Sequence, residues 1–224
     1  MPMSGGWTMS MMWMPMPGQT WPAVAASFVG MWMLMMVPMM LPTVAPVLWR
    51  HRAAVVRSGV ERAGALTATV GAGYFFVWAV VGVAAFPVGA SAAAIVLDHP
   101  ALARAVPIVA GVTVTIAGAI QLTQWKAHIL ASCGWRSWRG GERPVGVADA
   151  WRDGIRLGVR CVASCANLMV IPLVVGVMDP RAMVVVGAAI AGERLSRHGE
   201  RVARVIGVML LAAGGVLIAR SVGL

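Results

Sequence analysis

Charged residues are scarce in this chain, and acidic residues are the scarcest of them. Of 224 residues, 12% are charged and only eight are Asp or Glu, whereas 59% are hydrophobic and the mean hydropathy is +0.80. Water cannot keep such a chain dispersed, so the composition indicates an integral membrane protein. No stretch of the sequence has the composition of a separate soluble domain.

The residue patterns of common catalytic and cofactor sites are also missing. The three cysteines form no C-x-x-C pair and no zinc spacing with the four histidines. Serine, histidine and aspartate show no nucleophile and base arrangement, and no glycine-rich phosphate loop follows a strand. Every histidine falls in a loop or at a helix end, which gives no indication of bis-histidine haem ligation. We therefore expect no catalytic residues.

Long apolar runs are present instead, and they predict an all-α, polytopic membrane bundle of about six transmembrane helices. Most runs approach the ~20 residues that a ~30 Å hydrocarbon core requires. The fifth run is short, so it either spans with Glu193 inside the bundle or at the inner interface, or forms a re-entrant segment. The expected helices cover residues 23–48, 64–87, 103–124, 157–178, 181–193 and 203–222.

Basic residues gather in alternate loops of this expected bundle. Fifteen of the eighteen Lys and Arg residues follow the first, third and fifth helices. The positive-inside rule then places both termini outside the cytoplasm, in a multi-pass protein of the bacterial inner membrane. Because this distribution explains the net charge of +10, no nucleic-acid partner is expected.

Two parts of the chain are distinguished by composition. Residues 1–22 form a methionine-rich extracytoplasmic segment, and residues 23–224 form the helix bundle. Within the bundle, the cytoplasmic loop 125–156 mixes tryptophan with arginine, which is typical of a segment along the inner headgroups. An interfacial helix is expected around residues 145–156.

Methionine is concentrated at the N-terminus, where thirteen of seventeen fall within the first 40 residues. The thioether is a soft donor that favours Cu(I) over Mg, Ca or Zn, and it forms no disulfide in an oxidising compartment. Flexible packing at a membrane surface is the alternative interpretation. The predicted Cu(I) ligands of the N-terminal segment are Met9, Met11, Met12, Met14 and Met16.

The first expected helix carries a second group of methionines. Pro38, Pro42 and Pro46 recur every four residues and would bend the helix. A bent helix with adjacent sulfurs suits a binding or transit point, although a core or lipid-facing stripe is the alternative. Helical spacing places Met31, Met35 and Met39 on one face with Trp32 and Met36 beside them, while Met33 and Met40 point elsewhere.

Cysteine completes the set of predicted sulfur ligands on the cytoplasmic side. Cys161 and Cys165 are one helical turn apart, with Met169 one turn further on, so the three share one face. A reducing compartment keeps thiolates available for a soft metal, whereas simple burial as small apolar groups is the alternative. A disulfide between cysteines one turn apart would be strained.

Polar residues at membrane depth are the remaining candidates. Lys126, Asn167 and Glu193 are predicted to support the site as structural or outer residues. Glu193 is expected to form an ion pair with Lys126 or Arg160.

Several stretches resemble a bacterial family labelled predicted metal-binding integral membrane protein (domain of unknown function 2182). They are "WMLMMVPMMLPTVAP", "YFFVWAVVG", "AGAIQLTQWK", "CVASCANLMVIPLVVGVMD" and "GERLSRHGERVARVIGVMLLAAGG", in order over residues 32–215. The resemblance implies a multi-helix membrane protein with suspected metal binding and a methionine-rich outer segment. Ile129, Ser164 and Ala166 stand where the family tends to show cysteine or tryptophan, so only part of its sulfur set is retained.

These observations together predict a membrane protein that captures Cu(I) outside and holds or relays it. The expected partners are the lipid bilayer and a copper-accepting protein or the subunits of a membrane complex. A non-catalytic accessory subunit of a larger membrane oxidase or monooxygenase is the first alternative. A membrane thiol oxidoreductase using Cys161 and Cys165 is the second.

Overall fold

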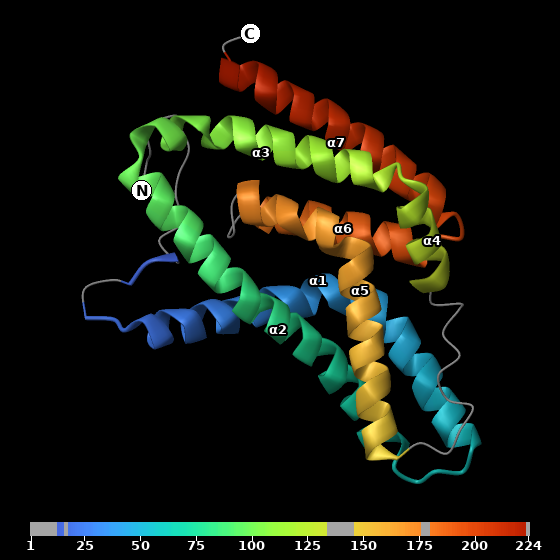
Figure 1. Ribbon diagram of the computed structural model, residues 1–224. Coiled ribbons are helices and arrows are strands. Elements are labelled where there is room, and N and C mark those ends of the chain that lie inside the picture. The colour runs from blue at the N-terminus through green and yellow to red at the C-terminus, as the bar shows by residue number, and fades with distance from the viewer. Residues whose placement is uncertain (1–12, 16–17, 134–145, 176–179, 223–224) are drawn as a thin grey trace.

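The computed structural model describes residues 13–15, 18–133, 146–175 and 180–222. Within these ranges the chain forms seven helices and no strand (Figure 1), which confirms the all-α bundle. The helices are α1 (Trp21–Arg57), α2 (Ala63–Asp98), α3 (Pro100–Gln121), α4 (Gln124–Cys133), α5 (Val147–Val175), α6 (Pro180–Leu195) and α7 (Gly199–Val222).

Five of these helices, α1, α2, α3, α5 and α7, are long and apolar enough to cross a membrane, as expected for a multi-pass membrane protein. Helix α6 corresponds to the short fifth segment. Its 16 residues rise only about 24 Å at about 1.5 Å per residue, which is less than the ~30 Å hydrocarbon core.

The third expected segment ends earlier than predicted and is followed by a separate helix. Helix α3 stops at Gln121, where Leu122 N–H donates to the Ala119 carbonyl (3.1 Å) in a tightened last turn. Helix α4 then begins at Gln124, and the Thr123 hydroxyl accepts from Lys126 N–H (3.3 Å). A polar hydroxyl at this position therefore starts a new helix inside the loop expected at 125–156.

The expected interfacial helix at 145–156 is not a separate element, because α5 runs without a break from Val147 to Val175. Its first turns pack on α2. A Cβ placed on Gly73 of α2 would lie 2.7 Å from the Trp151 carbonyl oxygen and 3.2 Å from the Gly154 Cα. Paired glycines thus bring the two backbones into contact and hold this part of α5 against α2.

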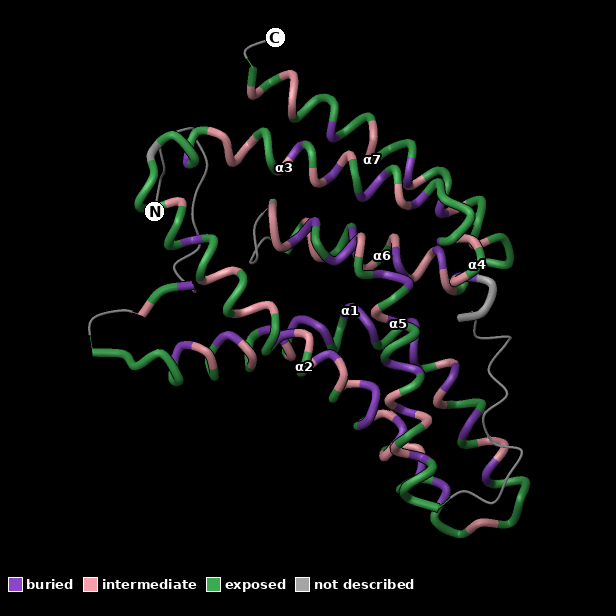
Figure 2. Tube along the Cα trace, in the orientation of Figure 1, coloured by how far each residue is buried: buried purple, intermediate pink, exposed green. Residues whose placement is uncertain are grey.

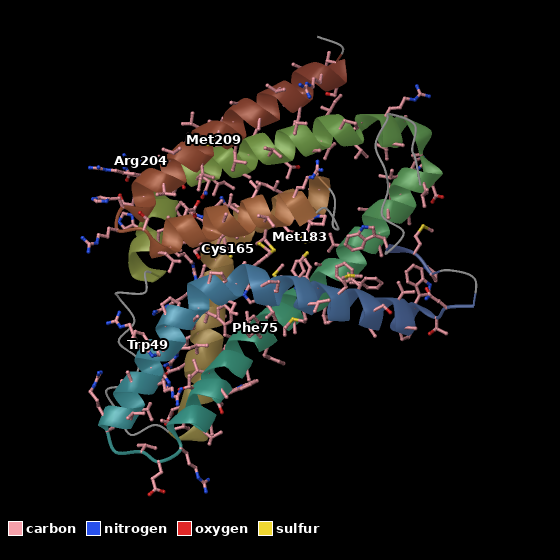
Figure 3. The ribbon with its side chains drawn as sticks, turned by 180° about the vertical axis from the view of Figure 1, so that it is seen from behind. Trp49, Phe75, Cys165, Met183, Arg204 and Met209 are labelled. Atoms are coloured by element: carbon pink, nitrogen blue, oxygen red, sulfur yellow. The ribbon has the colours of Figure 1, made fainter. Side chains whose placement is uncertain are left out.

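Helix α1 changes direction near its middle, as Figures 1 and 3 show from opposite sides. Pro38, Pro42 and Pro46 all lie inside it. Each proline removes one backbone donor and crowds the preceding turn, which explains the predicted bend. The bend brings the middle of α1 onto α6 while its end packs on α2.

Buried residues concentrate where α1, α2, α5 and α6 meet, whereas α3 and α7 leave much of their surface exposed (Figure 2). This distribution is the one expected if lipid covers the outer helices. The main core therefore lies on the α1 bend, around the methionines and cysteines.

Helices α3 and α7 lie side by side through glycines spaced seven residues apart on each. A Cβ on Gly118 would lie 2.9 Å from the Gly207 carbonyl oxygen, and a Cβ on Gly214 would lie 2.8 Å from that of Gly111. Small residues that let helix backbones approach are a common basis of helix association in membranes.

We expect Gly214→Leu to destabilise the protein by at least about 2 kcal/mol, because the new side chain must separate α3 from α7. Gly215→Leu is the matched control, since a Cβ at Gly215 meets nothing within 4 Å. Thermal unfolding in detergent compares the two. Equal melting temperatures for both variants would contradict close glycine packing.

Candidate metal centre

Three sulfur atoms from α1 and α5 meet in the core. Cys161 Sγ lies 4.0 Å from Cys165 Sγ and 3.9 Å from Met40 Sδ. All three side chains are buried, with at most 1% of each residue exposed. The cysteines lie one turn apart on α5, as predicted, and Met40 reaches them from the bent part of α1.

The two separations measured from Cys161 Sγ are close to those that one shared soft ion requires. Three sulfurs that each lie about 2.3 Å from a common ion in a trigonal plane are separated from one another by about 4.0 Å. Two thiolates and a thioether are soft ligands that favour Cu(I) over harder cations. Among the described residues, no group of three or more His, Cys, Asp or Glu could hold a metal ion.

The predicted metal-facing side of α1 was partly wrong. Met40, which was expected to point elsewhere, is 0% exposed and contacts Cys161. Met31, which was expected to face the site, is 41% exposed on the opposite side. The buried face of α1 includes Met35, Met36 and Met39 of the predicted set, and it extends to Met40 in place of Met31.

The other predicted sulfur ligands of the bundle lie in the same core as the cysteines. Met35, Met36, Met39 and Met169 are all buried in it. Figure 3 shows sulfur atoms gathered between α1 and α6, around the labelled Cys165 and Met183. Met183 lies one turn before Gly187 on α6, and a Cβ on Gly187 would meet the Met39 side chain.

Four of the five predicted ligands of the N-terminal segment, Met9, Met11, Met12 and Met16, lie outside the described residues. Met14 is described and is 37% exposed. The neighbouring Trp13 is buried, with its ring centroid 4.8 Å from that of Phe28. Trp13 also covers Gly89 of α2. The segment therefore reaches the bundle at the α1 and α2 face.

A buried polar network lies beside the sulfur centre. Lys126 Nζ is 3.1 Å from Glu193 Oε2, so the predicted ion pair forms with Lys126 and not with Arg160. Lys126 also donates to the Ser164 carbonyl and to Asn167 Oδ1 (3.3 Å). Gln121 donates to Glu193 and accepts from Asn167 Nδ2 (3.1 Å). Helices α3, α4, α5 and α6 are thereby joined at one level.

Ser164 connects this network to the cysteines. Its hydroxyl donates to the Cys161 carbonyl (2.8 Å) and accepts from Arg194 Nη2 (2.6 Å). Two cationic side chains, Lys126 and Arg194, are thus held on the residue that precedes Cys165. Their positive charge would offset the negative charge of thiolates that hold a monovalent ion.

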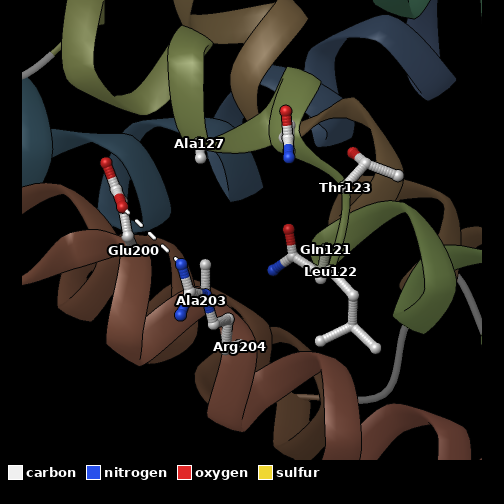
Figure 4. A pocket seen from close by; sticks show the side chains of 8 residues that line it. Gln121, Leu122, Thr123, Ala127, Glu200, Ala203 and Arg204 are labelled. Carbon is white, nitrogen blue, oxygen red and sulfur yellow. Dashed lines mark ion pairs between the residues drawn. The ribbon is translucent and has the colours of Figure 1, made fainter.

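A small pocket adjoins the network on the side of the turn between α3 and α4 (Figure 4). Gln121 lies at its inner side, and Glu200 and Arg204 of α7 form an ion pair (4.0 Å) at its edge. No sulfur atom lines this pocket, so it is distinct from the sulfur centre.

Trp32 of α1 packs against α2. It is 3% exposed, and its indole nitrogen donates to the Trp78 carbonyl (2.9 Å). The ring lies on Gly82, where a Cβ would come within 2.6 Å of it. Sequence reasoning missed Tyr74, whose hydroxyl lies 3.0 Å from Cys161 Sγ. Tyr74 is the one tyrosine of the chain. It carries a polar hydroxyl inside an apolar helix, and this feature could have marked it as a candidate site residue.

Comparison with known proteins indicates the family of this chain. A family model described as PpoB2, copper chaperone, matches residues 29–217. No curated protein and no solved structure matches the chain. The match covers α1 to α7 almost completely and supports the copper-related part of the resemblance described above. The chain belongs to the PpoB2 family of copper chaperones.

Proposed function

We propose that this protein is a membrane-embedded Cu(I) carrier that holds the ion between Cys161, Cys165 and Met40 and passes it to a copper-accepting protein. The observation that carries the proposal is the convergence of three buried sulfurs at separations of 3.9 and 4.0 Å. Membership of a copper chaperone family supplies the expectation of a receiving partner. No chemical reaction on a substrate is part of the proposal.

A mixed set of ligands suits transfer. Thiolates bind soft ions tightly, whereas a thioether is neutral and binds more weakly, so Met40 is the ligand most easily exchanged. Met36 and Met39 add two further thioethers to the same buried cluster, and Met183 packs against it. A Cu(I) ion could therefore change one ligand at a time without meeting water.

The direction of transfer follows from the distribution of charge. Basic loops on one side indicate a bacterial inner membrane protein with both termini outside the cytoplasm. In that orientation the methionines of residues 1–22 capture Cu(I) from the outer side. Trp13, seated on Phe28 and Gly89, brings this segment to the face of the bundle that leads to Met36 and Met40.

Cu(I) titration of the purified protein under reducing conditions tests the proposal. Wild type is expected to bind one tight equivalent and additional weak equivalents. Replacement of all five tail ligands, Met9, Met11, Met12, Met14 and Met16, by leucine is expected to remove only the weak equivalents. Leucine keeps the apolar bulk of methionine and removes the sulfur donor.

A chelator competition series separates the two classes of site, with protein lacking added copper as the baseline. If wild type binds no Cu(I) more tightly than detergent alone, the proposed function is wrong. If the tail variant loses the tight equivalent, the tail and not the buried centre is the main site.

A further inference from the structure

Two side chains of α2 surround the sulfur of Cys161. Tyr74 is 0% exposed, and its hydroxyl lies 3.0 Å from Cys161 Sγ. Trp78 lies one turn further along α2 and is 1% exposed. Both belong to the same buried cluster as Cys161. The sulfur is thus approached by two aromatic residues that each carry one polar hydrogen.

The indole N–H of Trp78 has no hydrogen-bond partner, although it is completely buried. Trp78 lies one helical turn from Tyr74 on α2, and all three of Tyr74, Trp78 and Cys161 belong to the same buried cluster. A buried hydrogen-bond donor without a partner destabilises the fold by about 1–3 kcal/mol, and such donors are rare in folded proteins. An acceptor that is present in only one state of the protein would account for this donor.

The position of the indole is fixed by the backbone around it. The Trp78 carbonyl accepts from Trp32 Nε1 (2.9 Å), and Trp32 in turn rests on Gly82. Trp78 therefore sits in a frame of α1 and α2 residues, independent of any contact made by its own N–H.

We infer that Tyr74 and Trp78 are positioning residues that donate hydrogen bonds to Cys161 Sγ when this sulfur carries a metal ion. The inference rests on the proposed function and specifies the surroundings of its site. A neutral thiol is a weak acceptor, whereas a metal-bound thiolate carries negative charge and accepts more strongly. Trp78 gains its missing partner on loading, so the centre favours the metal-bound form.

The two cysteines thereby take different roles. Cys165 Sγ donates to the Cys161 carbonyl (2.9 Å) within α5. Cys161 Sγ lies 3.0 Å from the Tyr74 hydroxyl of α2 and 3.9 Å from Met40 Sδ of α1. Cys161 is therefore the sulfur that α1, α2 and α5 share, and the one whose loss most affects metal retention.

Trp78→Phe and Tyr74→Phe test this inference by chelator competition for Cu(I). Each is expected to weaken Cu(I) affinity about 10-fold to 100-fold, the usual effect of losing an outer hydrogen bond to a metal ligand. Trp125→Phe is the matched control, because Trp125 is 59% exposed and should bind as wild type does. In ¹⁵N-labelled wild type, the Trp78 indole resonance is expected to move downfield on addition of Cu(I).

The possible outcomes distinguish a failure of this inference from a failure of the proposed Cu(I) carrier function. Tight Cu(I) binding by wild type with unchanged affinity in both α2 variants overturns the inference and leaves the function in place. A Trp78 indole resonance that does not move on loading does the same, even if a variant fails to fold. Absence of Cu(I) binding by wild type overturns both.

Discussion

Cu(I) affinity is expected to fall by more than about 100-fold when Cys161 and Cys165 are both replaced by serine. Losing an outer contact to a metal ligand already costs about 10-fold to 100-fold, and this change removes two ligands of the proposed centre. Serine preserves the size of the side chain but offers a hard oxygen donor that Cu(I) does not favour. Competition with a Cu(I) chelator of known affinity measures the change.

A single thioether change provides the graded comparison. Met40→Leu should weaken binding about 10-fold, because two thiolate ligands remain. Met209→Leu is its matched control: Met209 is 65% exposed on α7, apart from the sulfur centre (Figure 3). Retention of the tight equivalent by the double cysteine variant would show that the cysteines serve packing alone.

The second large effect is expected at the buried ion pair. Lys126→Met should destabilise the protein by about 3–5 kcal/mol, because Glu193 would be left as an unpaired charge. The two side chains are at most 2% exposed and only 3.1 Å apart, so water cannot replace the lost partner. The free energy of unfolding in mixed micelles, measured for wild type and variant, tests this.

Two further variants distinguish the pair from the loss of one lysine. Adding Glu193→Gln to Lys126→Met should recover part of the stability, because the amide keeps a polar group for Gln121 while the unpaired charge disappears. Arg204→Met is the exposed control; its pair with Glu200 is 4.0 Å long and at least half exposed on both sides, and its loss should cost less than about 1 kcal/mol. Equal destabilisation by Arg204→Met and Lys126→Met would contradict a buried pair.

The fold class could be predicted from composition, because apolar runs of membrane length permit little except helices. The ion pair of Lys126 and Glu193 could also be predicted from the sequence, since isolated charges at membrane depth must find a partner. Arg160 was an equally plausible partner in sequence. Only the packing of α4 against α5 and α6 decides between them.

The face of α1 could not be predicted, because apolar residues surround the helix and give no periodic signal. The three prolines made the bend predictable but not its direction. Met31 is exposed and Met40 is buried, so the orientation of α1 about its own axis decides which thioether contacts Cys161. The contact between Gly73 and Gly154 was likewise not predicted. It holds the start of α5 on α2, whereas the arginines and tryptophan of this stretch had suggested a separate helix along the headgroups.

The length of α6 also affects how the protein fits its bilayer. A helix of 16 residues spans about 24 Å, so its ends cannot both reach the surfaces of a ~30 Å hydrocarbon layer. The Lys126 and Glu193 pair lies at one end of this helix, within the bundle. If α6 crosses the bilayer, hydrophobic mismatch therefore acts on it more than on its longer neighbours. We then expect the stability of the ion pair to depend on the acyl-chain length of the surrounding lipid.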